Sequence, residues 1–229
     1  MTAASAQRAL AWCDAWNRAH PWDHNAHHHG WIERHLPPRI DTVLDVGCGT
    51  GELARRLSRR ARHVTGLDAD PGSIDTARRL SLEPSRGRGD VDFQCVDLMT
   101  AALPGGYDAI TALAVLHHVP FEPALARLRD LLAPAGTLVV LGVYREETPS
   151  DHLLSAAAVP ANLVMGTVKT LQRRSRQRPV TVNPPTAPTT TTLREIRDVA
   201  SRQTPGAALR RHLFWRYSLR YTAPPEGSR

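Results

Sequence analysis

The sequence predicts an α/β fold in which a mostly parallel sheet of seven strands is flanked by helices. Short β-type segments alternate with amphipathic helical segments from about residue 40 onward, an order typical of parallel sheets. Several glycines cluster at one strand-to-helix junction, residues 47–51, where such folds commonly bind a ligand. With 229 residues, the chain is long enough for one domain of this kind and an added cap or lid.

Each element follows from a local pattern of apolar residues. Strands are expected at residues 42–46, 63–67, 91–96, 107–111, 137–143, 208–213 and 214–221. Helices are expected at residues 52–60, 71–80, 122–132 and 193–200. Asp70 is expected to cap the helix that begins with Pro71. Residues 134–136 should end the preceding helix before the fifth strand, and the last two strands could form an antiparallel pair.

Two segments fall outside this alternation. Residues 1–36 are expected to form an N-terminal helical cap, and residues 37–229 the main domain. Within that domain, about 145–192 is expected to be a lid-like insertion. Its first part is compatible with a helix broken at Pro160, and its second part is rich in Pro and Thr, which disfavour regular helix.

Composition excludes several classes of protein. No run approaches the roughly 20 apolar residues of a membrane helix, and no signal-peptide core is present, so we expect cytoplasmic residence. The three cysteines, Cys13, Cys48 and Cys95, form no C-x-x-C pair, which argues against a disulfide framework or a zinc ribbon. The net charge is +7, but Lys169 is the only lysine. An arginine bias of this kind resembles genome composition more than a nucleic-acid surface.

The most informative segment is Leu-Asp-Val-Gly-Cys-Gly-Thr-Gly, residues 44–51. Glycines between a strand and a helix let the backbone turn sharply and approach a ligand closely. The segment resembles motif I of the class I S-adenosylmethionine-dependent methyltransferases, and the order of elements from about residue 40 to 222 resembles their Rossmann-like fold. The resemblance implies S-adenosylmethionine as cofactor, S-adenosylhomocysteine as product, and cofactor contacts from Asp45, Gly47, Cys48, Gly49 and Gly51.

A dinucleotide-binding fold is the competing interpretation of the same glycines. Its G-x-G-x-x-G signature would place a third glycine at position 52, where this chain has Glu52. A carboxylate at the helix N-terminus would repel a pyrophosphate, whereas S-adenosylmethionine carries no phosphate. The departure from the dinucleotide pattern favours the methyl donor.

Two acidic residues follow the second and third strands. Asp68, followed by Ala69, can accept hydrogen bonds from both ribose hydroxyls; a helix N-cap is the alternative, but Asp70 already fills that role. Asp97, followed by Leu98, resembles the family residue that binds the adenine amino group, and a surface turn is the alternative. By the same resemblance, the backbone near Ala112 and Leu113 should face the methionine part of the cofactor.

Two histidines after the fourth strand are the candidates for catalysis. Methyl transfer relies mainly on holding the acceptor in line and desolvated, and a phenol or alcohol also needs its proton removed. His117 or His118 could be that base, although one of them could instead bond the backbone. The family's Asn/Asp-Pro-Pro-aromatic motif is missing here; Asn183-Pro184-Pro185-Thr186 imitates it in the wrong place and lacks the aromatic residue.

A second histidine cluster lies in the expected cap, at residues 24–29. His24 and His28 are four residues apart and could share one helical face, but no carboxylate or cysteine accompanies them at ligand spacing. We therefore expect no metal. Because caps of this family often close over the donor, His24, Asn25 and His28 are candidates for contact with cofactor or substrate.

The resulting hypothesis is a methyltransferase acting on a small organic molecule, with O-methylation first and N- or C-methylation behind it, as in secondary metabolism. The expected partner is a small-molecule acceptor, with neither nucleic acid nor membrane. A nucleic-acid methyltransferase and a non-catalytic methyltransferase-like scaffold remain the alternatives. Intact glycines, Asp68 and Asp97 argue against a decayed cofactor pocket.

Overall fold

The computed structural model describes residues 15–16, 24–82, 89–176, 189–213 and 216–227. The strands are β1 (Ile40–Val46), β2 (Ala61–Asp68), β3 (Asp90–Cys95), β4 (Tyr107–Leu113), β5 (Leu132–Val143), β6 (Ala208–His212) and β7 (Arg216–Thr222). The helices named here are α2 (His24–His35), α3 (Glu52–Leu57), α4 (Pro71–Ser81), the short 3-10 helix η1 (Leu116–His118), α5 (Phe121–Asp130), α6 (Pro149–Arg176) and α7 (Leu193–Gln203).

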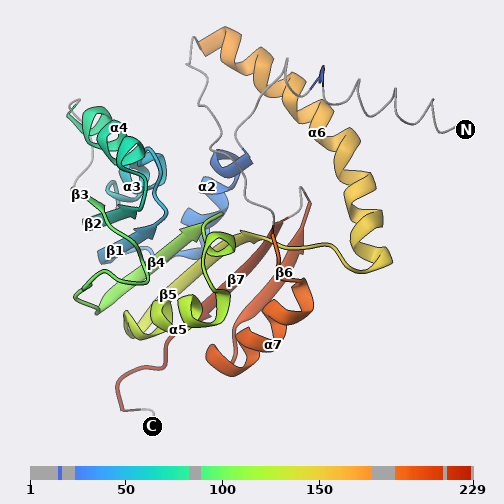
Figure 1. The fold of residues 1–229 in the computed structure, drawn as a ribbon. Coiled ribbons are helices and arrows are strands. Elements are labelled where there is room, and N and C mark those ends of the chain that lie inside the picture. Colours follow the sequence, from blue (N-terminus) through green and yellow to red (C-terminus); the bar gives the residue numbers. More distant parts are fainter. Residues whose placement is uncertain (1–14, 17–23, 83–88, 177–188, 214–215, 228–229) are drawn as a thin grey trace, which may run out of the picture. The chain divides into compact units, whose positions relative to one another are not determined.

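The seven strands form one sheet in the order β3-β2-β1-β4-β5-β7-β6 (Figure 1). The pairs β1–β2, β1–β4, β2–β3 and β4–β5 are parallel, and β5 and β7 are antiparallel. The predicted α/β class, with a mostly parallel sheet of seven strands, is confirmed. The strand order reverses between β1 and β4, and ligands bind such sheets at the carboxyl ends of strands near this point.

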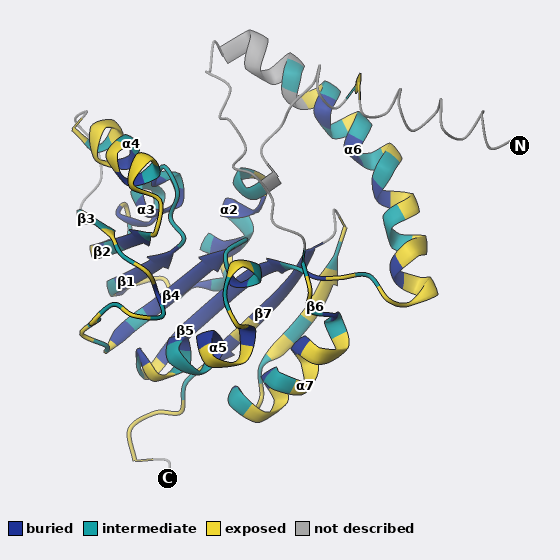
Figure 2. Cartoon of the chain, viewed as in Figure 1, coloured by how far each residue is buried: buried dark blue, intermediate teal, exposed yellow. Residues whose placement is uncertain are grey.

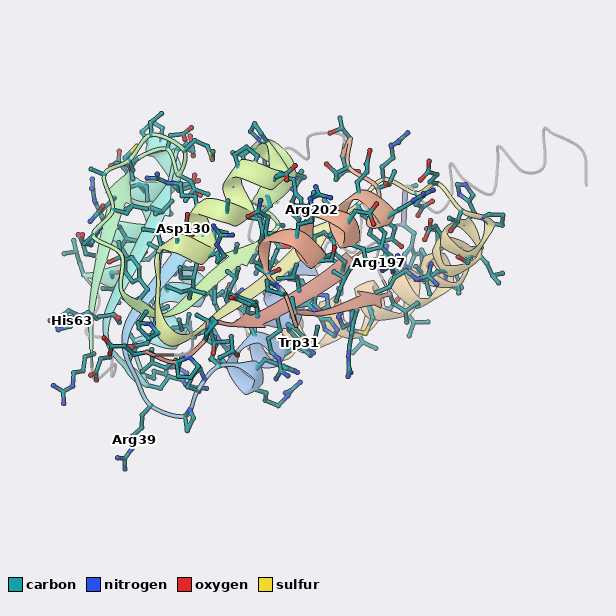
Figure 3. The ribbon with its side chains drawn as sticks, turned by 90° about the horizontal axis from the view of Figure 1, so that it is seen from below. Trp31, Arg39, His63, Asp130, Arg197 and Arg202 are labelled. Atoms are coloured by element: carbon teal, nitrogen blue, oxygen red, sulfur yellow. The ribbon has the colours of Figure 1, made fainter. Side chains whose placement is uncertain are left out.

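Helices cover both faces of the sheet and make two hydrophobic cores. One core joins the sheet to α5 and α7 through residues such as Leu125, Leu128 and Ile196. The other joins it to α2, α3 and α4 through residues such as Ile32, Leu53 and Ile74. Figure 2 shows the central strands almost wholly buried between these layers. In Figure 3, the labelled Trp31 lies on the α2 side of the sheet, and Arg197 and Arg202 project from α7 on the other.

Most expected elements are present, with corrections at their ends. The helix expected at residues 52–60 ends at Leu57, and the one expected to reach residue 132 ends at Asp130. Strand β5 begins at Leu132, before the turn at residues 134–136, because Tyr107 pairs with Leu132 and the register then shifts. In α4, Ile74 and Ala77 are buried, but Leu80 in the last turn is 49% exposed.

Pro160 does not break the insertion, as was expected, but lies inside the single helix α6. A proline removes the hydrogen bond to the carbonyl four residues earlier. Because Pro160 and Ala156 are both exposed, water can bond that carbonyl, and the neighbouring alanines favour helix. Helix α6 belongs to a compact unit separate from the sheet unit, and its role as a lid stays a prediction.

The expected cap and loop are only partly covered by the described residues. Only residues 15–16 and 24–36 of the cap fall within them, and only residues 189–192 of the Pro/Thr-rich loop. Ile32 and Leu36, from α2 and its end, are buried in the same core as α3. None of the helices that the structure describes is both long and apolar enough to cross a membrane.

Candidate functional site

The glycine loop after β1, residues 47–51, is closely packed at both ends and has open space in the middle. Gly47, Gly49 and Gly51 all have left-handed backbone, with φ of 65°, 53° and 76°. A Cβ added to Gly47 would lie 2.6 Å from Val115 Cβ, and one added to Gly51 would lie 2.5 Å from Phe93 Cζ. A Cβ added to Gly49 would meet no atom within 4 Å. The loop therefore packs through its outer glycines and leaves room for a ligand at the central one.

Asp68, at the end of β2, holds this loop in place. Its Oδ2 accepts a hydrogen bond from the Gly49 amide at 2.8 Å, and its Oδ1 accepts one from the Asp70 amide at 2.9 Å. Asp70 in turn caps α4 by accepting from the Ser73 amide at 2.8 Å, so the predicted cap is confirmed. The Asp68 carboxylate is half-buried beside the open glycine, and each oxygen has a further lone pair for a ligand hydroxyl.

Asp45 lies within β1, inside the strand expected at residues 42–46. The carboxyl group is 2% exposed and accepts a hydrogen bond at Oδ1 from Thr111 Oγ1 at 2.7 Å. Among the described residues its Oδ2 has no hydrogen-bond partner. Burial, aided by the charge of Asp68, raises the pKa of Asp45 to about 7. A ligand cation nearby would favour the ionised form of this carboxyl.

Four further candidates lie near the glycine loop or after β3. Asp97 is exposed and accepts a hydrogen bond from the Met99 amide at 2.6 Å, while Leu98 is buried against the core. Ala69 is exposed beside Asp68. Cys48 is a free thiol whose pKa is raised by burial and then by the charges of Asp45 and Asp68. The thiol is therefore protonated at neutral pH and is a packing group, not a nucleophile.

The carboxyl end of β4 changes direction abruptly. Ala112 and Leu113 are buried, and Ala114 then adopts a left-handed conformation with φ of 54°. The Ala114 amide donates to the Leu141 carbonyl on β5 at 2.7 Å. A non-glycine residue in this conformation is strained, and such strain is concentrated at functional sites. The turn directs the chain into η1, which carries both candidate histidines.

His117 and His118 have different surroundings. Their ring centroids are 3.9 Å apart, but His118 is exposed and His117 is half-buried. The Nδ1 atom of His117 is buried and has no hydrogen-bond partner among the described residues. Burial first, and then the charges of His118 and Arg216, lower the pKa of His117 to about 4. His117 is therefore neutral at physiological pH and a weak base.

The influence of Arg216 was not anticipated from the sequence. Along the last expected strand, the apolar residues Tyr217 and Leu219 alternate with the polar residues Arg216 and Ser218. Both polar residues are nonetheless buried, with exposed fractions of 9% for Arg216 and 2% for Ser218. The Nη2 of Arg216 donates to Asn25 Oδ1 at 2.8 Å.

The cap candidates lie on α2. Asn25 contacts Arg216, and His28 is buried, with its ring centroid 5.0 Å from that of His27. The side chain of His24 lies outside the described residues. Within the ranges described, no group of three or more His, Cys, Asp or Glu is arranged to hold a metal ion.

The chain is similar in sequence to known methyltransferases. A family model described as "Methyltransferase domain" matches residues 43–136. An uncharacterized methyltransferase of Mycobacterium tuberculosis is 35% identical over 210 residues, covering 89% of this chain and 98% of the relative. A ubiquinone biosynthesis O-methyltransferase of Xanthomonas campestris is 40% identical over 114 residues, covering 49% of this chain and 46% of that protein.

Solved structures show the same fold. The N-methyltransferase NodS from Bradyrhizobium japonicum, in complex with S-adenosyl-L-homocysteine, matches with a TM-score of 0.57 and 16% identity, over 92% of this chain and 97% of its own. A methyltransferase from Methanosarcina mazei matches with a TM-score of 0.56 and 15% identity, over 86% and 98% of the two chains.

Proposed function

The chain belongs to the class I S-adenosylmethionine-dependent methyltransferases, and from this we propose that it methylates an oxygen atom of a small organic acceptor. S-adenosylmethionine is the methyl donor. The observation that carries the proposal is the glycine loop, open at Gly49 and held by Asp68. It follows β1 at the carboxyl end of the sheet, where parallel sheets of this kind bind ligands.

The residues present fit S-adenosylmethionine. The open space at Gly49 lets the donor approach the backbone. The carboxylate of Asp68 would accept hydrogen bonds from the ribose hydroxyls while it still holds the loop. Asp97, with Leu98 beside it, would bind the adenine end. At the other end of the donor, Asp45 has a buried carboxyl oxygen without a partner among the described residues, which suits a molecule that carries positive charge.

When bound, the donor supplies a methyl group activated by a sulfonium leaving group. This chain's own residues then have to orient the acceptor and exclude water. Ala112 and Leu113 would form the floor under the donor's methionine part. The strained turn at Ala114 leads into η1, which carries His117, and the acceptor would lie beside it.

We propose His117 as the histidine that contacts the acceptor, with the ring of His118 beside it at an interplanar angle of 40°. At neutral pH its imidazole is unprotonated and can receive a proton. Because its pKa is about 4, it removes a proton effectively only from an acidic hydroxyl such as a phenol with electron-withdrawing substituents. O-methylation is also the activity named for the Xanthomonas relative, which supports an oxygen acceptor.

Calorimetric titration of the purified protein with S-adenosylmethionine, S-adenosylhomocysteine and NAD tests the donor site. We expect the two sulfur nucleosides to bind and NAD not to bind. Gly49→Val should abolish binding. Gly106→Val is the matched control, because Gly106 also has left-handed backbone, with φ of 76°, and open space around it, but lies before β4 at the opposite edge of the sheet. Equal losses in both variants would contradict this placement of the donor.

The oxygen acceptor is tested separately by incubating the protein with S-adenosylmethionine and matched phenols, anilines and thiols. Formation of S-adenosylhomocysteine together with a methylated phenol supports the proposal. Methylation of the anilines alone would replace oxygen by nitrogen as the acceptor and leave the family assignment intact.

A further inference from the structure

A buried cation lies at the ligand-binding edge of the sheet. Arg216 is the first residue of β7 and pairs with Val143, the last residue of β5. Because β5 and β7 are antiparallel, the start of β7 lies at the carboxyl end of β5. Parallel sheets bind ligands at these carboxyl ends. Arg216 therefore lies along the same edge as the glycine loop, although it is far from the loop in sequence.

The strand order separates Arg216 from the donor side of this edge. The glycine loop follows β1, and the two acidic candidates, Asp68 and Asp97, follow β2 and β3. Arg216 lies on the other side of β4, since the order is β1-β4-β5-β7. Neighbouring strands are about 4.8 Å apart, so β7 is roughly 14 Å from β1. The guanidinium is therefore away from the proposed donor site, on the side of the sheet edge where the acceptor would lie.

The guanidinium is held in a fixed position. Its Nη2 donates to Asn25 Oδ1 at 2.8 Å, and Asn25 is in the first turn of α2. Helix α2 is itself attached to α3: Arg56 Nη2 donates to Glu33 Oε2 at 2.7 Å, and Arg60 Nη1 donates to the Glu33 carbonyl at 2.7 Å. A guanidinium fixed in this way loses little conformational entropy when it binds a ligand.

Arg216 also influences His117 electrostatically. The positive charge of Arg216 is close enough to contribute to the low pKa of His117, whose buried Nδ1 has no hydrogen-bond partner among the described residues. A weak base beside a cation is poorly suited to an acceptor that must lose a proton of high pKa. The pair suits an acceptor with an anionic oxygen, because the cation attracts the oxygen and the neutral imidazole can share a hydrogen bond with the molecule.

We propose that Arg216 binds a carboxylate of the methyl acceptor, with Asn25 as the residue that positions the guanidinium. This inference rests on the proposed function, since it names the class of acceptor for the same site. At 9% exposure, Arg216 is screened little by solvent, so a charge-assisted hydrogen bond to a carboxylate is strong there. The donor's methionine part also has a carboxylate, and the experiment must separate these two sources.

The test uses 3,4-dihydroxybenzoate and its uncharged analogue 3,4-dihydroxybenzamide, which have the same hydroxyl groups. Their dissociation constants are measured by calorimetry on the protein saturated with S-adenosylhomocysteine. We expect the acid to bind at least about tenfold more tightly than the amide, since a hydrogen bond to a charged group contributes that much or more. Failure of the acid to bind, or equal binding of the two probes, would overturn the proposal.

Variants identify the cation that causes the preference. Arg216→Met should remove the preference for the acid and leave the affinity for S-adenosylhomocysteine unchanged. Arg216→Lys keeps a charge but not the two-pronged geometry, so it should keep part of the preference. Arg220→Met is the matched control, because Arg220 lies on the same face of β7 but is exposed, and it should behave as the parent protein.

The outcomes distinguish the two proposals. If Arg216→Met weakens binding of S-adenosylhomocysteine as much as it weakens binding of the acid, Arg216 serves the donor and the acceptor proposal is wrong. If the parent protein does not bind S-adenosylhomocysteine at all, the donor site has been misplaced. Should Arg216→Met fail to fold, Arg216→Lys and Asn25→Ala take its place: Asn25→Ala should lower the acid preference by loosening the guanidinium, and an unchanged preference in both would overturn the assignment.

Discussion

The backbone amide of Gly49 donates a 2.8 Å hydrogen bond to Oδ2 of Asp68. The carboxylate expected to bind ribose therefore also fixes the loop that receives the donor. This hydrogen bond joins two segments that are 19 residues apart in sequence. Preorganisation of this kind lowers the entropy that is lost when the ligand binds.

Asp68→Ala should weaken binding of S-adenosylhomocysteine by about 10- to 100-fold or more, because it removes hydrogen bonds that involve a charged group. Asp68→Asn should lie between Asp68→Ala and the parent protein, since its amide has only one accepting oxygen. Calorimetry measures both. Asp70→Ala is the control: Asp70 caps α4, so this variant should be less stable yet bind the nucleoside normally. A normal affinity in Asp68→Ala would remove Asp68 from the donor site.

Asp45 makes the stability of the ligand-free protein depend on pH. Its pKa is raised from 3.8 to about 7 in the folded state, so between about pH 4 and 7 the folded chain keeps a proton that the unfolded chain has lost. Stability therefore falls as pH rises through this window, by at most about 1.4 kcal/mol per pH unit from this group. Asp45→Asn cannot titrate and should lack this contribution.

Urea unfolding of the parent protein and Asp45→Asn at pH 5, 6 and 7 measures the effect. The difference between the two free energies of unfolding isolates Asp45 from the other titrating groups, which are common to both proteins. The difference should shift in favour of Asp45→Asn as pH rises. A difference that is the same at all three pH values would show that the carboxyl has an ordinary pKa.

The fold could be predicted from the sequence because its elements are local. Alternating apolar patterns marked all seven strands, and Asp70 before Pro71 marked the start of α4. Element ends were less well predicted, since tertiary contacts decide them: the pairing of Tyr107 with Leu132 extends β5 across residues that were expected to form a turn. The prediction that Pro160 breaks the helix was wrong, because exposure to water allows a proline inside α6.

The candidate site was also predicted only in part from the sequence. The glycine loop, Asp68 and Asp97 could be placed from short motifs at strand ends. The contact of Arg216 with Asn25 could not, because the two residues are 191 positions apart in sequence. The low pKa of His117 arises partly from that same arginine and was equally inaccessible. The long-range pairing of β7 with β5 is what brings Arg216 to the same sheet edge as the glycine loop.

Close packing at Gly142 is a second long-range relationship that the sequence did not reveal. A Cβ added to Gly142 would lie 2.5 Å from Tyr217 Cε1, and Tyr217 is 1% exposed, so its ring cannot move aside easily. Gly142→Ala should destabilise the fold by roughly 1–3 kcal/mol, the usual cost of overpacking a core. Chemical denaturation measures the loss. Gly72→Ala is the control for losing a glycine, because Gly72 also lacks left-handed backbone and an added Cβ would come no closer than 3.5 Å to another atom. Equal stabilities of Gly142→Ala and the parent protein would mean that the ring can shift at little cost.

His117 should remain neutral over the whole physiological range. Its pKa of about 4 results first from burial and then from the charges of His118 and Arg216, all of which disfavour a second ring proton. Titration of the ring signals by NMR should therefore show one histidine with a midpoint far below the usual value of about 6.5, assigned by its loss in His117→Asn. Arg216→Met removes a neighbouring positive charge and should raise that midpoint, whereas Arg220→Met, on the exposed part of the same strand, should leave it unchanged. A midpoint near 6.5 in the parent protein would make His117 an ordinary base that could deprotonate a simple phenol, and the weak-base argument for an acidic acceptor would then fail.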